Sequence, residues 1–160
     1  MALLDELEKL SFLRHFAPVY QRQIASLARL AEYPAEAEIF TEGHMGQQIY
    51  LVVEGYVTLH IHVPDQEGIQ VHAVGPGQLL GWSPVLGLGP MTATARTLTP
   101  CRLAALDAAQ ILALAESNPK FGREFYRCTA AALADRLRAT RLQIPEARHH
   151  ELLALKEGSD

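Results

Sequence analysis

The residues best suited to binding a small molecule lie in one glycine- and proline-rich stretch, residues 75–96 (GPGQLLGWSPVLGLGPMTATAR). Hydroxyl groups and backbone N–H groups can bind an anion without a formal charge. The hydroxyl of Thr92 and the amides near Gly81 and Ala93 therefore predict an anion site, the alternative being a turn that only closes the fold. The nearest positive charge is Arg96, which shares one side of a predicted strand with Thr92 because strand side chains alternate.

Trp82, the only tryptophan of the chain, has two interpretations. Its ring can stack on a planar ligand, or it can fill the pocket and close it. Ser83 follows it but lacks the glycine two residues later that a nucleophile elbow requires. No Ser–His–acid or Cys–His arrangement and no P-loop is indicated by the spacing, so we do not expect an enzyme of these classes.

Histidines on a predicted strand suggest a different chemistry. His60 and His62 point to the same side of residues 57–63, as two metal-binding imidazoles would. His72 would share that side if the strand register permits. The spacing resembles the first metal motif of the cupins, which here comprises Gly55, His60, His62 and Glu67. The apolar residues that alternate with these histidines are expected to face the interior of the barrel, which leaves the histidines facing water. The second cupin motif is also absent. A metal-dependent cupin-type enzyme is therefore only an alternative.

Composition limits the class of protein. The chain has 160 residues, 49% of them hydrophobic and 20% charged, which predicts one globular domain with a proper core. A formal net charge of −4 gives no basic field for nucleic acid. Cys101 and Cys128 form no CxxC pair and are expected to be buried thiols in a reducing compartment. Without a membrane-length apolar run or a secretory signal, we expect a cytoplasmic protein.

The elements that must position these residues follow from hydrophobic periodicity. A period of two with glycine turns predicts short antiparallel strands at residues 39–40, 49–53, 57–63, 69–74, 92–97 and 101–106. Helical spacing predicts helices over residues 2–10, 18–32, 108–116 and 119–144. The fold class is therefore mainly β with flanking helices: an antiparallel, jelly-roll-like β-roll with two short N-terminal helices and a long C-terminal helix. Pro145 ends that helix, and residues 146–160 are expected to form a short tail.

The stretch around Gly81 resembles the phosphate-binding cassette of the cyclic-nucleotide-binding domain family, the sensor half of the Crp/Fnr regulators. In that family a glycine and a glutamate open a short helix, and an arginine, a Ser/Thr and an alanine close the cassette. Gly81, Thr92 and Ala93 match this frame, whereas Trp82 takes the place of the glutamate and Met91 that of the arginine. The family's turn glycines are matched by Gly43, Gly46, Gly55, Gly75 and Gly77.

The resemblance implies a domain over residues 1–145 and a cassette that differs from the family's in both of its charged residues. A cyclic phosphate held without arginine loses a charge-assisted hydrogen bond often worth about 1.5–3 kcal/mol. Arg96 would replace that arginine or be a solvated arginine at a strand end. Thr140, on the long helix, would contact the base of a ligand or lie on the surface. The predicted site comprises Gly81, Trp82, Ser83, Met91, Thr92, Ala93, Arg96 and Thr140.

The family pairs its long helix with a twin, so the resemblance implies a homodimer through residues 121–144. The winged helix of Crp/Fnr regulators would begin where this sequence stops, so no direct nucleic-acid binding is expected. The expected function is a stand-alone regulatory sensor that binds a small ligand, with cAMP or cGMP as candidates, and signals through the helix. The alternative within this fold is a ligand-free protein-interaction module whose pocket is filled by Trp82 and Met91.

Overall fold

The computed structural model of the chain describes residues 2–141, without the side chains of residues 2, 67, 140 and 141. The predicted tail at 146–160, the break at Pro145 and the last turn of the predicted helix lie outside these residues. The strands are β1 (Arg29–Tyr33), β2 (Glu38–Phe40), β3 (Gln48–Glu54), β4 (Val57–Val63), β5 (Gln66–Val74), β6 (Leu79–Leu80), β7 (Thr94–Thr97) and β8 (Cys101–Asp107). The helices are α1 (Ala2–Glu8), α2 (Ser11–Arg14), α3 (Pro18–Leu27), α4 (Ser83–Leu86), α5 (Ala108–Ser117) and α6 (Pro119–Arg141).

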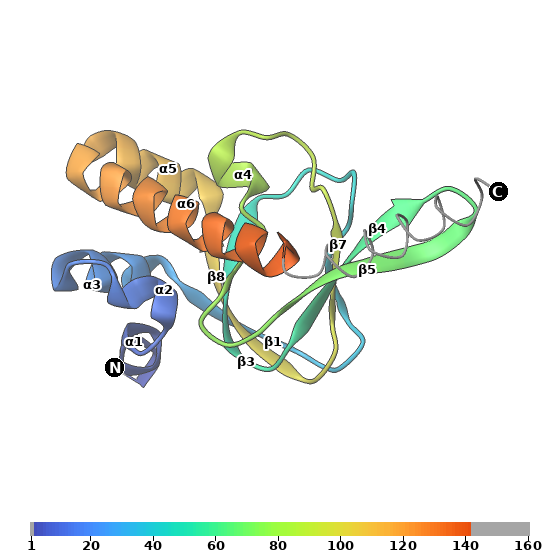
Figure 1. Ribbon diagram of the computed structural model, residues 1–160. Coiled ribbons are helices and arrows are strands. Elements are labelled where there is room, and N and C mark those ends of the chain that lie inside the picture. Colours follow the sequence, from blue (N-terminus) through green and yellow to red (C-terminus); the bar gives the residue numbers. More distant parts are fainter. Residues whose placement is uncertain (1, 142–160) are drawn as a thin grey trace.

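The strands form two four-stranded sheets in which every pairing is antiparallel, with the orders β1-β8-β3-β6 and β2-β7-β4-β5. Helices α1–α3, α5 and α6 gather on one side of the β-roll, and the β4–β5 hairpin extends on the other side (Figure 1). The predicted fold class, a mainly β antiparallel roll with flanking helices and a long C-terminal helix, is confirmed.

Strand β3 is apolar on both faces because it separates two cores. Tyr50 and Val52 point into the space between the two sheets, where they join residues such as Leu103. Ile49 and Leu51, on the other face, pack against the helices. A strand buried on both sides reads as a continuous apolar run, as residues 49–53 do.

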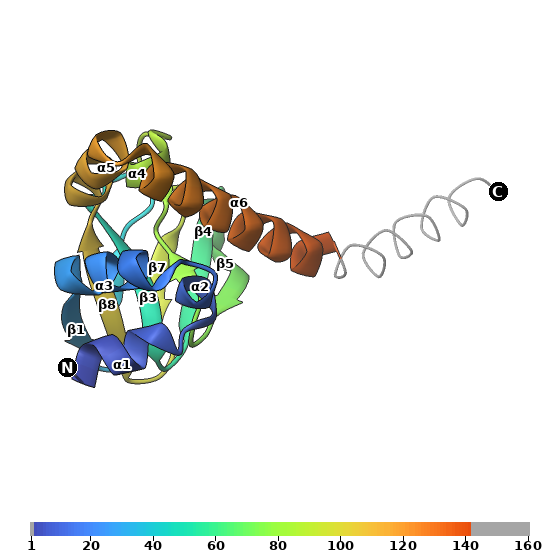
Figure 2. The same ribbon diagram turned by 90° about the vertical axis from the view of Figure 1, so that its left-hand side faces the viewer.

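The helical core is built around aromatic side chains from both ends of the described chain. Phe12 and Phe16 meet Phe121 and Phe125 of α6, with ring centroids 5.4–6.5 Å apart. Phe121 and Phe125 are almost fully buried. This cluster fixes the first half of α6 against α2 and α3, and the second half of α6 continues past the β-roll (Figure 2).

The predicted helix over residues 18–32 is wrong after Leu27. Helix α3 ends at Leu27, and Arg29–Tyr33 forms β1, which pairs with β8 from Arg29 opposite Ala105 to Tyr33 opposite Cys101. The alanines and leucines there have helical spacing, but pairing to an open sheet edge overrides such local propensity.

Smaller differences concern element ends. The described part of the chain has three short N-terminal helices rather than two, because Ser11–Arg14 forms a turn of helix. Strand β7 begins at Thr94 rather than Thr92, and β5 begins at Gln66 rather than at the predicted residue 69. Asp65 adopts a φ of 67°, which lets this hairpin turn so tightly.

Two further predictions concern single residues and membrane spans. Cys101 and Cys128 are buried free thiols, as predicted, and burial raises the pKa of each. Within residues 2–141, no helix combines the length and the apolar character needed to cross a membrane.

Candidate functional site

The glycine-rich stretch folds into a tight cap over the end of the β-roll. Gly81 has a φ of 76°, which favours glycine, and a Cβ atom there would lie 3.2 Å from Phe40 Cε1, so a side chain at this position would displace that ring. Trp82 and Ser83 then open the short helix α4, which ends at the left-handed Gly87. This short helix after a glycine is the frame that the sequence predicted.

Met91, at the other end of the cap, is held by its backbone and its side chain. Its N–H donates to the carbonyl oxygen of His44 at 2.9 Å, and its carbonyl oxygen accepts from the N–H of Gly43 at 2.8 Å. Its sulfur would lie 2.6 Å from a Cβ on Gly46, so the side chain uses the space that this glycine leaves. Met91 is therefore a fixed, buried wall with 4% of its surface exposed.

A cavity of about 250 Å³ opens beside this cap. Six of the predicted site residues line it together: Gly81, Trp82, Ser83, Met91, Thr92 and Ala93. The strands contribute further apolar walls from Phe40, Leu59, Ile61, Val71 and Leu80. Trp82 and Met91 line this cavity and do not fill it. The structure therefore does not favour the hypothesis of a pocket closed by these two side chains.

Arg136 of α6 also lines the cavity and contacts the cap. Its guanidinium carbon lies 4.5 Å from the centre of the Trp82 ring, in a cation–π contact. Its Nη2 donates to the carbonyl oxygen of Leu79 at 2.6 Å. Burial lowers the pKa of Arg136 to about 10, so the group is still charged at neutral pH. One side chain therefore joins the C-terminal half of α6 to the cassette.

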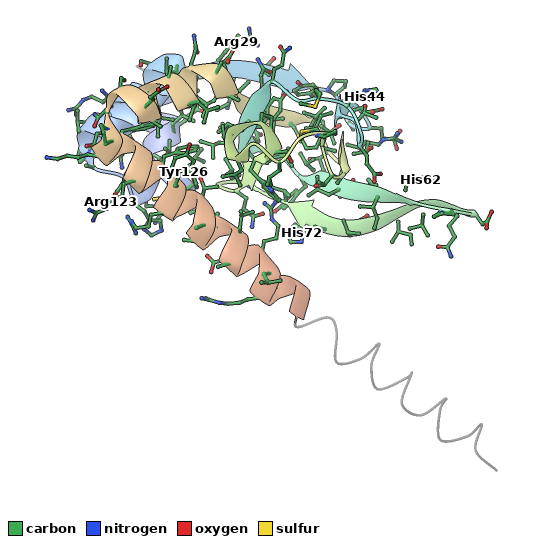
Figure 3. All side chains as sticks on the ribbon, turned by 90° about the horizontal axis from the view of Figure 1, so that it is seen from above. Arg29, His44, His62, His72, Arg123 and Tyr126 are labelled. Atoms are coloured by element: carbon green, nitrogen blue, oxygen red, sulfur yellow. The ribbon has the colours of Figure 1, made fainter. Side chains whose placement is uncertain are left out.

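His72 of β5 lies between this cavity and a second one of about 200 Å³ beneath α6. It pairs with Leu59 and therefore shares the inner face of the sheet. Burial, and then the charge of Arg136, lower the pKa of His72 below its usual value. Figure 3 shows His72 beside α6 and His62 on the other side of the hairpin.

The register of β4 against β5 tests the prediction of a cupin-type metal site. The prediction that His72 could share a face with His60 and His62 is wrong, because the β4–β5 register places it opposite Leu59. The Nε2 of His60 is instead hydrogen-bonded to Thr58 Oγ1 at 2.8 Å. The side chain of Glu67 lies outside the described residues, and among the described side chains no three of His, Cys, Asp or Glu come together in a way that could hold a metal ion.

One predicted site residue, Arg96, is not among the residues that line the cavity. Arg96 is exposed on the outer face of β7, near Thr94 and His60, so the solvated alternative describes its position. The prediction that Arg96 shares one side of a strand with Thr92 is wrong, because β7 begins only at Thr94 and Thr92 lines the cassette cavity instead. Thr140 lies in α6, and its side chain is among those that the structure does not describe.

The sequence interpretation missed Arg136, which it did not include in the predicted site. The helix in fact has two apolar stripes. The buried one contains Phe121, Phe125, Cys128 and Ala132, and Arg136 is the next position along it. A charged residue at a position that continues a buried stripe is a signal that could have identified it.

Comparison with known proteins agrees with this frame. The family model for the cyclic nucleotide-binding domain matches residues 30–118. The cyclic AMP receptor protein of Thermus thermophilus is 35% identical over 127 residues, covering 79% of this chain and 54% of the relative. A CRP-like cAMP-activated global transcriptional regulator of Mycobacterium tuberculosis is 27% identical over 128 residues, covering 78% and 55%. The chain thus spans about half the length of these curated relatives.

Solved structures give the same result. The catabolite activator protein of Thermus thermophilus has a TM-score of 0.70 and 29% identity, covering 86% of this chain and 62% of that one. A cyclic nucleotide-binding domain from Methylobacillus flagellatus has a TM-score of 0.78 at 21% identity, covering 91% and 82%, and supports the fold. With a family model matching more than half of its residues, this chain belongs to the cyclic nucleotide-binding domain family.

Proposed function

We propose that this chain is a regulatory sensor domain, spanning residues 1–145, that binds a small molecule in the cassette cavity and signals through α6. The observation that carries this proposal is the position of Arg136. It lines the cavity and contacts both Trp82 and the Leu79 carbonyl, while its backbone belongs to the long helix. A molecule in the cavity would therefore meet the cassette and α6 together.

A ligand can shift α6 only if it binds two arrangements of the helix with different affinity. The contacts of Arg136 are the source of this difference in affinity that we propose. A ligand beside the Trp82 ring would either displace Arg136 from its cation–π contact at 4.5 Å or bind next to it, and the two cases favour different helix positions. The aromatic cluster of Phe121 and Phe125 holds the first half of the helix. We therefore expect the response in the second half, near Arg136.

Cyclic nucleotides are the first ligands to test, since two relatives are named for cyclic AMP. The cassette here presents Trp82 and Met91 where the family has its glutamate and arginine. Loss of a charge-assisted hydrogen bond costs about 1.5–3 kcal/mol, or roughly tenfold to a hundredfold in affinity. We expect cAMP and cGMP to bind weakly, if the cavity accepts them.

The proposal includes a homodimer through residues 121–144. Apolar and small residues follow a heptad-like 4-3-4 spacing along an open side of α6: Tyr126, Ala130, Leu133 and Leu137. Tyr126 is 41% exposed and Leu137 is 54% exposed, which is unusual for large apolar side chains on one stripe. A second copy of the helix would cover this stripe by coiled-coil packing.

The single tryptophan makes the test direct, because Trp82 lines the cavity. Titration with cAMP and cGMP, followed by Trp82 fluorescence and calorimetry, measures binding. Hydrogen exchange of α6 with and without ligand measures coupling. A bound ligand should slow or speed exchange in the second half of α6 and leave the region of Phe121 unchanged. Binding with no change anywhere in α6 would contradict signalling through the helix.

A further inference from the structure

The cavity is chemically unlike a nucleotide site. Of the described residues that line it, none is Asp or Glu, so the hydroxyl groups of a sugar would find no carboxylate to accept their protons. The polar side chains are those of His72, Ser83, Thr92 and Arg136. A buried hydroxyl group without a hydrogen-bond partner disfavours binding. A ligand for this site therefore has an apolar body with few hydroxyl groups.

The apolar walls suit a flat or compact hydrocarbon body. Phe40, Leu80, Trp82 and Met91 surround the space from three segments of the chain. The faces of aromatic rings and the thioether of methionine both pack well against aromatic groups. An apolar cavity of about 150 Å³ is enough for benzene. The 250 Å³ available here admits a ring with a short side chain.

The charge in the cavity wall is positive. Arg136 contributes the guanidinium, and burial is tolerated because the group stacks on Trp82 and donates to the Leu79 carbonyl. A carboxylate is a stronger acceptor than a neutral carbonyl, because a charge-assisted hydrogen bond is about twice as strong. Its planar fork also matches the guanidinium in a bidentate pair. A carboxylate in this cavity would therefore meet a hydrogen-bonding cation in the wall.

We propose that the natural ligand of this cavity is a small organic monocarboxylic acid with an aromatic or compact aliphatic body. Its carboxylate pairs with Arg136, and its body lies among Phe40, Leu80, Trp82 and Met91. The proposal rests on the sensor function above and names the chemical class of its ligand. It also makes the charge of the ligand the part that is read by α6, since Arg136 belongs to that helix.

Matched probes separate charge from shape. We would titrate the protein with 3-phenylpropanoic acid, with the neutral alcohol 3-phenylpropanol, and with cAMP, following Trp82 fluorescence and calorimetry. The acid should bind at least tenfold more tightly than the alcohol. Arg136→Gln should remove this preference and bring the acid close to the alcohol. Arg138→Gln removes an exposed charge two residues away and should bind both probes as the unchanged protein does.

A buried arginine can also support folding, so a second variant is needed. Arg136→Lys keeps the charge but not the planar fork, and should keep part of the preference for the acid. Circular dichroism shows whether each variant folds. If Arg136→Gln does not fold, the acid-to-alcohol ratio in the unchanged protein and in Arg136→Lys still decides the proposal.

Each outcome has a definite meaning. Equal binding of acid and alcohol overturns the carboxylate inference and leaves a ligand-binding sensor in place. Binding of cAMP without binding of the acid does the same. An acid preference that survives in a folded Arg136→Gln protein also overturns the assignment to this residue. If none of the three probes binds, the inference is overturned and the sensor function is contradicted as well.

Discussion

His72 and Arg136 are the two residues whose chemistry depends most on the fold around them. The Nε2 of His72 is buried and has no hydrogen-bond partner among the described residues. Its ring lines the cavity that Arg136 also lines, and the positive charge of Arg136 disfavours a second cation nearby. Burial and the charge of Arg136 therefore favour the neutral form of His72 in the folded protein by lowering its pKa.

This neutral state predicts a pH dependence of stability. The pKa of His72 is lowered in the folded protein and close to 6.5 in the unfolded chain. Below about pH 6.5 the unfolded state binds more protons, so the free energy of unfolding decreases as the pH falls through this range. His72→Gln should lose less stability than the unchanged protein between pH 7.5 and pH 5.5, measured by urea unfolding. His62→Gln, exposed on the opposite side of the hairpin, is the control. Equal losses in His72→Gln and the unchanged protein would rule out this role.

At the scale of elements, tight turns determine where the strands can meet. Gly55 joins β3 to β4 with a φ of 92°, and a Cβ atom there would lie 2.4 Å from the carbonyl oxygen of Pro100. Gly87 ends α4 with a φ of 65°, but a Cβ atom there would meet nothing within 4 Å. Both positions require the left-handed region, and only one is also crowded.

These two glycines give a matched pair of substitutions. Gly87→Ala should lower the free energy of unfolding by about 1–2 kcal/mol, the cost of a left-handed alanine. Gly55→Ala adds overlap with the backbone at Pro100 and should cost about 3–5 kcal/mol. Urea unfolding of both variants measures the difference. Similar losses for the two would mean that the β3–β4 turn moves away from Pro100 without cost.

The elements that the sequence predicted well are those whose signal is local. Strands β3, β4 and β8 were predicted because their apolar residues follow strand periodicity, and α5 because its residues have helical spacing. Strand β1 was not predicted, since its residues have helical spacing and become a strand only by pairing with β8.

The cassette residues were predicted because they are contiguous in the chain. The wall made by Arg136 comes from 54 residues beyond Trp82 and depends on how α6 crosses the roll. That crossing is a tertiary feature, which periodicity can only suggest.

In the whole molecule, α6 has one stripe packed against the helical core and the cavity, and another stripe that is exposed. Its buried stripe runs from the Phe121 cluster to Arg136 and the cavity, and its exposed stripe runs along Tyr126, Ala130, Leu133 and Leu137. A ligand that moves Arg136 would also move Leu137, its neighbour in the helix. In the proposed sensor, the cavity and the dimer contact are therefore coupled within one turn of helix.

The exposed stripe predicts a dimer that one charge can break. Leu137→Glu places a carboxylate in an apolar helix pair, where burial of an unpaired charge is costly. The unchanged protein should sediment as a dimer at tens of micromolar, and Leu137→Glu as a monomer. Because Leu137 is 54% exposed in the single chain, its replacement should leave the thermal stability of the monomer nearly unchanged. Ala113→Glu adds the same charge on the exposed side of α5 and should remain dimeric. A monomeric unchanged protein at that concentration would exclude the dimer, and a dimeric Leu137→Glu would place the contact elsewhere on the molecule.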